Sequence, residues 1–106
     1  MHNIKSETSK IIREILNKHD PMGLIAIGCP VNEYDPEVSR IVQINPIALN
    51  VQEFGLKIYE VFVVMFSKEN AGDKVIYVSI ANDIKDSIDN MCKRIKSKRD
   101  LEKIRF

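Results

Sequence analysis

A chain of 106 residues is long enough for one domain with its own core, and its 44% hydrophobic and 29% charged residues are those of an ordinary globular protein. The formal net charge of +1 excludes a strong overall attraction to nucleic acid or to an anionic membrane. The longest apolar run unbroken by glycine or proline, residues 61–66, is far shorter than the roughly 20 residues that span a bilayer. We therefore expect a single cytoplasmic domain spanning residues 1–106.

The N-terminal segment and the cysteines also bear on location. Charged residues recur through residues 5–14, so we expect no secretory signal peptide there. Cys29 and Cys92 lack the close spacing of a redox or metal motif. In a reducing compartment we expect both to be free thiols.

The charges are unevenly distributed along the chain. Residues 20–60 contain six acids against two bases, whereas residues 93–106 contain seven bases against two acids. The basic end could contact a phosphate backbone, which makes nucleic-acid association an alternative function. On a helix these bases would spread round the surface, and no aromatic residues interleave with them for base stacking. Stabilisation of a helix C-terminus is the favoured interpretation, and we expect nucleic acid not to be the partner.

A first helix and a long connection are predicted next. Apolar residues at helical spacing predict a helix over residues 5–18. Asp20-Pro21 ends it, because the residue before a proline is disfavoured in a helix. Residues 21–34 then include two glycines, two prolines and several large apolar side chains. A connection of this length is unusual in a compact domain and is often functional, so we expect a long ordered apolar loop that covers one end of the core.

The middle of the chain contains two helix starts. Asp35-Pro36-Glu37 predicts a second helix that runs to about residue 44, with Asp35 as its N-cap. Asn50 and Glu53 have the spacing of a capping box and predict a third helix over about residues 51–67.

This third helix is apolar on nearly all sides, so we expect it to be buried at the centre of the fold. Gly55 lies within it, although glycine costs about 1 kcal/mol against alanine in a helix. Its presence predicts close approach of another helix at that point.

The last segment supports two interpretations. Residues 74–80 are rich in β-branched side chains and resemble a strand. However, isoleucine and methionine recur every three or four residues from Ile76 to Ile95, which favours one long helix over about residues 74–97. A lone strand without a partner is also hard to stabilise. The fold class we predict is all-α, a small bundle of about four helices.

The residues that could perform chemistry are few. His19-Asp20 resembles part of a metal-dependent phosphohydrolase site, but the only other histidine is His2, so a helix-end role is favoured for His19. Cys29 would need a neighbouring base to become a nucleophile, and a structural thiol is the favoured interpretation. The acidic run at residues 33–37 lacks the pattern of a calcium loop. We therefore predict no catalytic residues, no metal site, no cofactor and no enzymatic activity.

The same acidic run suggests a binding surface for another protein. Clustered carboxylates steer a basic partner, and an adjacent aromatic residue can anchor it. The expected function is a non-enzymatic protein-binding module, in its most specific form a bacterial immunity protein that neutralises a cognate toxin domain by direct binding. The residues predicted to bind the partner are Asp20, Glu33, Tyr34, Asp35 and Glu37.

Three sequence stretches carry a family resemblance. The sequence DPMGL at residues 20–24 is followed by CPVNEYDPE at residues 29–37, and IYEVF occupies residues 58–62. Over roughly residues 1–66 the chain resembles the YugE-like family of small uncharacterised Bacillus proteins. The resemblance implies a small helical bundle and brings no known activity. Small domains of this sort also resemble immunity proteins encoded beside bacterial toxins.

Overall fold

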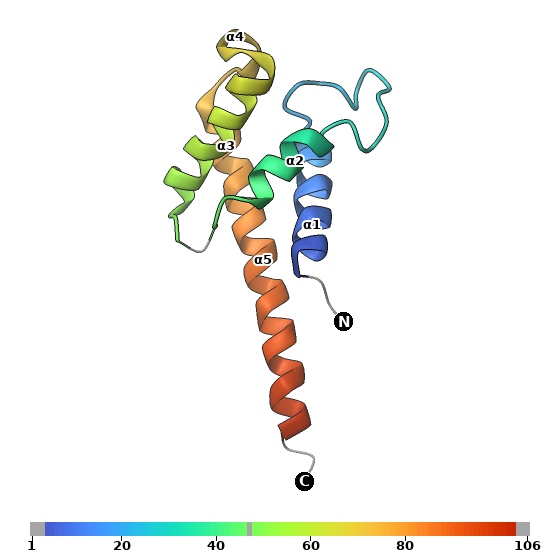
Figure 1. Cartoon of the computed structure of the whole chain (residues 1–106), viewed down its shortest axis with the longest axis vertical. Helices are drawn as coiled ribbons and strands as arrows, with labels where there is room; N and C mark the ends of the chain where they lie inside the picture. The colour runs from blue at the N-terminus through green and yellow to red at the C-terminus, as the bar shows by residue number, and fades with distance from the viewer. Residues whose placement is uncertain (1–3, 47, 104–106) are drawn as a thin grey trace.

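The computed structural model describes the backbone of residues 4–46 and 48–103 and the side chains of residues 7–46 and 48–93. Every regular element in this described backbone is a helix, which confirms the predicted all-α class (Figure 1). The described backbone contains five helices where about four were predicted, and the additional one, α4, is a single turn. The helices are α1 (Ile4–His19), α2 (Asp35–Val42), α3 (Val51–Phe66), α4 (Lys68–Ala71) and α5 (Lys74–Lys103).

The first helix ends where the sequence predicted. His19 is its last residue, and the next residue, Asp20, has a φ of 48°, in the left-handed region that ends helical hydrogen bonding. Aspartate tolerates this conformation better than most residues because its short side chain can bond locally. Residues 20–34 then form a series of turns before α2 begins.

The third helix begins at the predicted capping box. The Asn50 side chain accepts a hydrogen bond from the Glu53 amide at 2.8 Å, and the Glu53 carboxylate accepts one from the Asn50 amide at 3.3 Å. The helix ends at Phe66, because Ser67 takes a φ of 96° and becomes the N-cap of α4. The sequence predicted a loop after α3, whereas the structure has the one-turn helix α4 there.

Gly55 lies where α3 crosses α5, as its position in the sequence predicted. A β-carbon on Gly55 would lie 2.9 Å from the Cα of Val78, so the two helix backbones are in contact at this point. The strand interpretation of residues 74–80 was wrong, because these residues belong to α5 and pack through it against α3.

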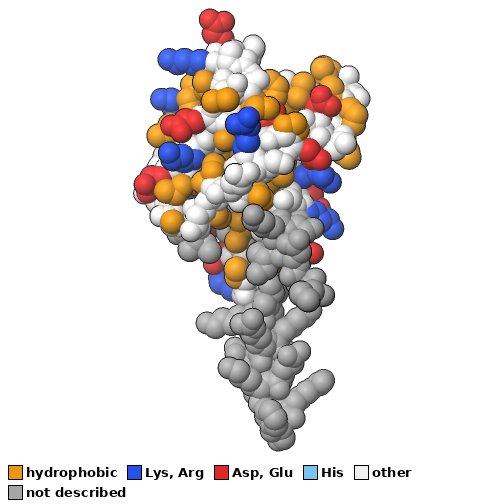
Figure 2. All heavy atoms as spheres, viewed as in Figure 1, with side chains coloured by type: hydrophobic (Ala, Val, Ile, Leu, Met, Phe, Trp, Pro, Cys, Tyr) orange, Lys and Arg blue, Asp and Glu red, His pale blue; other side chains and the backbone are white. Residues whose placement is uncertain are grey.

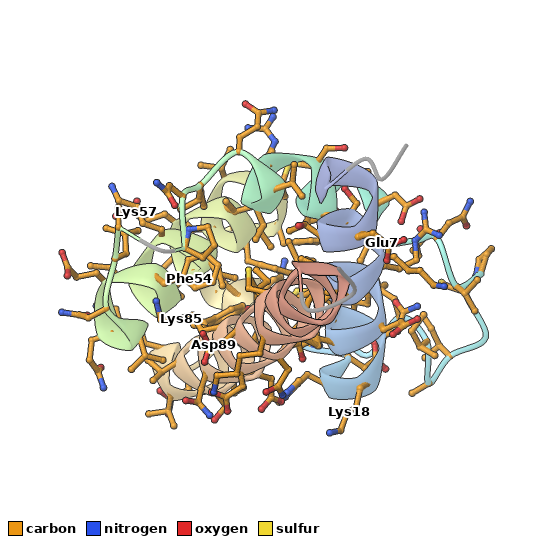
Figure 3. All side chains as sticks on the ribbon, turned by 90° about the horizontal axis from the view of Figure 1, so that it is seen from below. Glu7, Lys18, Phe54, Lys57, Lys85 and Asp89 are labelled. Carbon is orange, nitrogen blue, oxygen red and sulfur yellow. The ribbon has the colours of Figure 1, made fainter. Side chains whose placement is uncertain are left out.

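Aromatic side chains form the centre of the core. The Phe62 ring lies 6.1 Å from that of Tyr34, 5.7 Å from that of Phe66 and 5.1 Å from that of Tyr77, measured between centroids. Phe62 therefore joins the residue that precedes α2 to α5. Figure 3 shows Phe54 pointing into the same interior and Lys57 pointing outward from α3. Other fully buried side chains include Ile12, Leu16, Ile41, Ile58, Ile80 and Ile84.

The long α5 helix extends past the other helices in Figure 1 and carries two polar contacts that fix its neighbours. The imidazole Nε2 of His19 lies 2.7 Å from Oδ2 of Asp83 and joins the end of α1 to α5. The Lys85 Nζ donates hydrogen bonds to the carbonyl oxygens of Pro46 and Leu49 at 2.5 and 2.6 Å. One partly buried lysine thus holds the connection between α2 and α3 against α5.

Candidate functional site

The connection between α1 and α2 is held by the carboxylate of Asp20. Its Oδ1 accepts hydrogen bonds from the Tyr34 hydroxyl at 2.6 Å and from the Ile25 amide at 3.0 Å, and its Oδ2 accepts one from the Ala26 amide at 3.0 Å. Three bonds from three points of the segment converge on one side chain. This arrangement, together with Tyr34, is called here the Asp20 clamp.

Tyr34 is the second half of the clamp. Its ring is fully buried, and its hydroxyl accepts a hydrogen bond from the Met22 amide at 3.0 Å while donating to Asp20. Burial and the bond to Asp20 raise the pKa of Tyr34 far above its ordinary range. Desolvation raises the pKa of Asp20, but its hydrogen bonds outweigh that effect and leave the pKa below its ordinary value. The clamp is therefore a neutral phenol bonded to a charged carboxylate at physiological pH.

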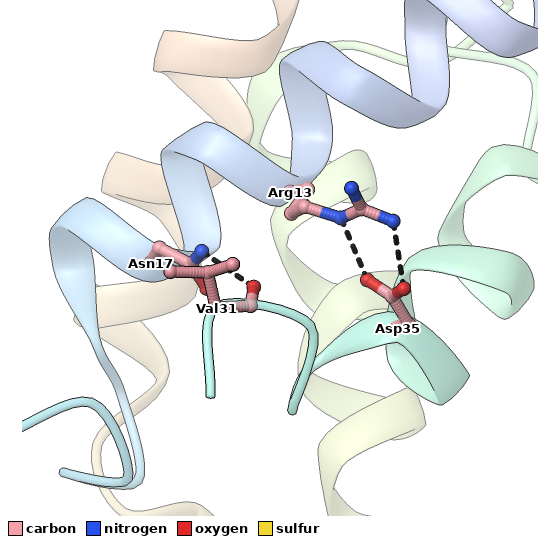
Figure 4. Close-up of polar contacts among 4 residues, drawn as sticks. All are labelled: Arg13, Asn17, Val31 and Asp35. Atoms are coloured by element: carbon pink, nitrogen blue, oxygen red, sulfur yellow. Dashed lines mark hydrogen bonds and ion pairs between the residues drawn. The ribbon is translucent and has the colours of Figure 1, made fainter. Parts of the chain in front are cut away.

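Two further contacts tie the segment to α1, and both are drawn in Figure 4. The Arg13 guanidinium donates two parallel hydrogen bonds to the Asp35 carboxylate, at 2.8 Å from Nε and 2.7 Å from Nη2. The Asn17 side-chain amide donates to the Val31 carbonyl at 2.7 Å. Arg13 and Asn17 are one helical turn apart, so a single face of α1 holds both the far end of the segment and the start of α2.

This well-anchored segment exposes large apolar side chains. Ile27 is 77% exposed and Val31 is 69% exposed, and the carboxylate of Glu33 lies beside them in the sequence and is also exposed. These three residues are called here the loop tip. In Figure 2 hydrophobic side chains gather at the upper right, where Figure 1 places the connection between α1 and α2.

The rest of the segment points inward. Met22, Leu24 and Ile25 are partly buried and pack against the core. Gly28, with a φ of 94°, turns the backbone between Ile27 and Val31, a conformation that suits glycine. The segment therefore has two sets of apolar side chains: Met22, Leu24 and Ile25 pack on the core, and Ile27 and Val31 face solvent.

The five residues predicted to bind a partner differ in what they contact. Glu33 is exposed, whereas Asp20 and Asp35 are half-buried and bonded to Tyr34 and Arg13. Tyr34 and Glu37 are buried. The sequence correctly suggested that these residues lie in one region. It did not reveal that Asp20, Tyr34 and Asp35 bond within the protein, or that Glu37 is buried.

Asp35 differs from its predicted local role, and Glu37 is buried. Asp35 is the first residue of α2 and not its N-cap, because its carboxylate is bound by Arg13 and Tyr34 occupies the cap position without a side-chain bond. Glu37 is 2% exposed, and its Oε2 atom has no hydrogen-bond partner. Burial raises the pKa of Glu37, and the nearby acids Glu33 and Asp35 raise it further.

Ile27 and Val31 were not singled out from the sequence. Composition predicted an apolar loop, but it did not separate the apolar residues within 21–34 that pack on the core from those that face solvent. The glycine at position 28 was the available signal, because a turn there separates residues on its two sides.

The residues weighed for chemistry have other contacts. His19 pairs with Asp83 and lies at the end of α1, as its helix-end interpretation predicted. Cys29 is a half-buried free thiol and Cys92 an exposed one. Among the residues that the structure describes, no three His, Cys, Asp or Glu side chains come close enough to hold a metal ion. In the same part of the chain no helix combines the length and the apolar character that a membrane crossing requires.

Comparisons with protein-family models, with curated proteins and with solved structures found no match to this chain. The functional argument therefore rests on the geometry of the α1–α2 connection.

Proposed function

We propose that this protein is a non-enzymatic protein-binding module and that the loop tip, Ile27, Val31 and Glu33, is its binding surface. In its most specific form it is a cytoplasmic immunity protein that neutralises a toxin domain by covering the toxin's active site. The single observation that carries the proposal is an exposed apolar tip on a segment anchored by the Asp20 clamp, Arg13 and Asn17.

The anchoring supports binding because it reduces the cost of association. A flexible loop loses conformational entropy when a partner orders it, whereas a loop already fixed in the free protein loses little. The Asp20 clamp fixes the backbone at Met22, Ile25 and Ala26, and Asn17 fixes it at Val31. The tip between these points is short and bends at Gly28. The tip would bind a partner in nearly the conformation that it has in the free protein.

The chemistry of the tip indicates what the partner presents. Ile27 and Val31 together offer two β-branched apolar groups, which fit a hydrophobic pocket at the centre of an interface. Glu33 adds an exposed carboxylate next to them, and Asp35 is already neutralised by Arg13. The partner surface we propose is an apolar pocket with a basic residue at its rim, which a nuclease or another basic toxin domain can provide.

The test uses two exposed valines as a matched pair. Val31 is 69% exposed on the loop tip, and Val64 is 71% exposed on α3. Wild-type protein, Val31→Asp and Val64→Asp would be immobilised separately and incubated with lysate of the native cell. A cognate partner should be retained by wild type and by Val64→Asp and lost from Val31→Asp.

The retained protein would then be purified and titrated against each variant by calorimetry. We expect one-to-one binding and at least a tenfold loss of affinity for Val31→Asp, because an unpaired charge would enter an apolar pocket. Co-expression with the partner should restore growth only for variants that bind. Equal binding by the two valine variants would contradict the loop tip as the surface.

A further inference from the structure

A shallow hollow of about 440 Å³ lies on α3 beside α4 and the start of α5. Its volume is within the range of small-molecule sites, which is roughly 300 to 1,000 Å³. In Figure 2 hydrophobic side chains lie among charged ones on the left, where Figure 1 places α3. The feature is called here the α3 hollow. The residues that line it are Tyr59, Glu60, Val63, Val64, Lys68 and Lys74.

The walls of the α3 hollow are mostly apolar. Val64 is 71% exposed and Val63 is half-buried, whereas the ring of Tyr59 is packed into the core and reaches the hollow from below. A ligand in the hollow would therefore cover valine side chains that water now contacts. Removing apolar surface from water favours binding, so the walls suit a ligand with an apolar body.

Two lysines line the same hollow, and the protein does not neutralise their charges. Within the described residues, the side chains of Lys68 and Lys74 form no hydrogen bond and no ion pair. The Nζ of Lys74 lies 5.4 Å from the centroid of the Tyr59 ring, and this cation–π contact keeps the charge at the edge of the hollow. Lys85 differs, because its Nζ already donates hydrogen bonds to two backbone carbonyl oxygens. The α3 hollow therefore presents two cations to a ligand.

The acid in the lining does not cancel this positive charge. The Glu60 carboxylate lies 3.9 Å from Nζ of Lys57, on the same helix. With Lys57 included, three lysines stand against this one acid. Two other acids, Glu69 and Asp73, are near in the sequence but do not line the hollow. The charge of the hollow therefore favours an anion.

We infer that the α3 hollow binds a small organic anion, a carboxylate with an aromatic or other apolar body. The body covers Val63 and Val64, and the carboxylate accepts charge-assisted hydrogen bonds from Lys68 and Lys74. An exposed ion pair alone contributes little, so both parts of the ligand are required. We expect a dissociation constant of about 1 mM, because the hollow is shallow. The site is separate from the loop tip, so it does not depend on the proposed function.

An NMR titration of the full chain with 2-naphthoate tests this inference. The methyl signals of Val63 and Val64 should shift and saturate at millimolar concentrations, whereas those of Ile27 and Val31 in the loop tip should not move. Two matched probes separate the parts of the ligand. Naphthamide has the ring without the charge, and acetate has the charge without the ring. Each should bind at least about fivefold more weakly than naphthoate.

Charge variants should change naphthoate binding in opposite directions. Lys68→Gln and Lys74→Gln should each weaken it by about threefold to tenfold, because each removes a charge-assisted hydrogen bond. Glu60→Gln should strengthen it by about twofold, because it removes the acid from the lining. Lys18→Gln is the matched control, since it removes an exposed lysine of α1 that points outward in Figure 3, and it should have no effect. Circular dichroism should show full helicity for all variants.

Three results would overturn the inference directly. They are no shift of Val63 and Val64 at about 10 mM naphthoate, equal binding of naphthoate and naphthamide, and equal binding by Lys68→Gln and Lys18→Gln. Two others would assign the hollow to a different occupant and overturn it as well. Shifts that follow the protein concentration but not naphthoate would indicate a second copy of the chain. Shifts with a peptide of leucine and glutamate but not with naphthoate would indicate an acidic protein segment.

Discussion

The α1–α2 region and the α3–α5 pair are held together in different ways. In the first, a few polar side chains fix the backbone: Asp20 and Tyr34 bond to one another and to the loop, and Arg13 binds Asp35. In the second, two helix backbones touch at Gly55 and Val78 and the contacts are apolar. The comparison teaches that an exposed valine can be held in place in two ways: Val31 lies in turns that side-chain hydrogen bonds fix, whereas Val64 lies in a regular helix.

The largest expected effect comes from the residue that joins the two regions. Phe62 contacts the rings of both Tyr34 and Tyr77 in the core. We expect Phe62→Ala to lower the free energy of unfolding by about 3 to 5 kcal/mol, because it removes a buried ring and leaves a cavity. Urea denaturation followed by circular dichroism measures this. Both regions should lose stability together. If hydrogen exchange shows a loss in only one region, Phe62 does not join the two.

Breaking the Asp20 clamp should have the next largest effect. Asp20→Ala removes the acceptor for the Tyr34 hydroxyl and for two backbone amides, so we expect about 2 to 3 kcal/mol lower stability. Tyr34→Phe is the matched variant, and it should cost only about 1 kcal/mol because the two amide bonds remain. Equal losses for the two variants would show that the amide bonds contribute nothing.

The clamp also has a pH signature. The pKa of Asp20 is lowered in the folded protein, so its contribution to stability is present above its unfolded-state pKa, about 3.9, and is lost as pH falls through its folded-state pKa. The stability difference between wild type and Asp20→Ala should therefore shrink in strong acid. A difference that is constant from pH 7 to pH 2 would contradict this.

Gly55→Ala probes the other region. The added methyl group would lie 2.9 Å from the Cα of Val78, so α3 and α5 must move apart. We expect a loss of about 1 to 2 kcal/mol, after allowing for the better helix propensity of alanine. Gln52→Ala, on the exposed side of the same helix, should change stability by less than about 0.5 kcal/mol. A stabilised Gly55→Ala protein would show that the close approach is not required.

The smallest effect is a stabilisation. Glu37 is buried in α2 with one carboxylate oxygen unpaired, and burial raises its pKa. Because its pKa is raised in the folded protein, the carboxyl contributes most to stability below its unfolded-state pKa of about 4.3. This contribution is lost as the pH rises through the folded-state pKa.

Glu37→Gln should therefore be more stable than wild type by about 1 kcal/mol at pH 7, because it avoids a buried charge. The advantage should disappear near pH 4, where the wild-type carboxyl is also neutral. Thermal denaturation of both proteins at pH 7 and pH 4 measures this difference in stability. A difference that grows toward low pH would contradict the raised pKa of Glu37.

The fold was more predictable from the sequence than the surface. Periodicity, the Asn50–Glu53 capping box and the Asp20-Pro21 stop are local signals, and they correctly predicted α1, α3 and the helical state of α5. The end of α3 was predicted to within one residue, but the one-turn helix α4 was missed, because no motif indicates the positive φ of Ser67 that starts it. The close contact between α3 and α5 at Gly55 is a tertiary feature that the sequence did predict, because a glycine that destabilises its helix requires a compensating contact.

The partners of polar side chains could not be predicted, because they depend on residues distant in the sequence. Asp35 was assigned to cap its own helix, whereas Arg13, 22 residues earlier, binds it. Tyr34 was predicted to anchor a partner and Glu37 to belong to an acidic binding surface, whereas both side chains are buried. The geometry of the turns determines which side chains of a loop face solvent. The exposure of Ile27 and Val31 could therefore be seen only in the structure.

The central claim is that the loop tip is held in place before any partner arrives, and amide hydrogen exchange of the free protein tests it most directly. The amides of Ile25 and Ala26 donate to Asp20, so they should exchange far more slowly than those of an unstructured peptide. In Asp20→Ala the same two amides should lose this protection while the amides of α3 keep theirs. Exchange of Ile25 and Ala26 at the unstructured rate in wild type would contradict the claim.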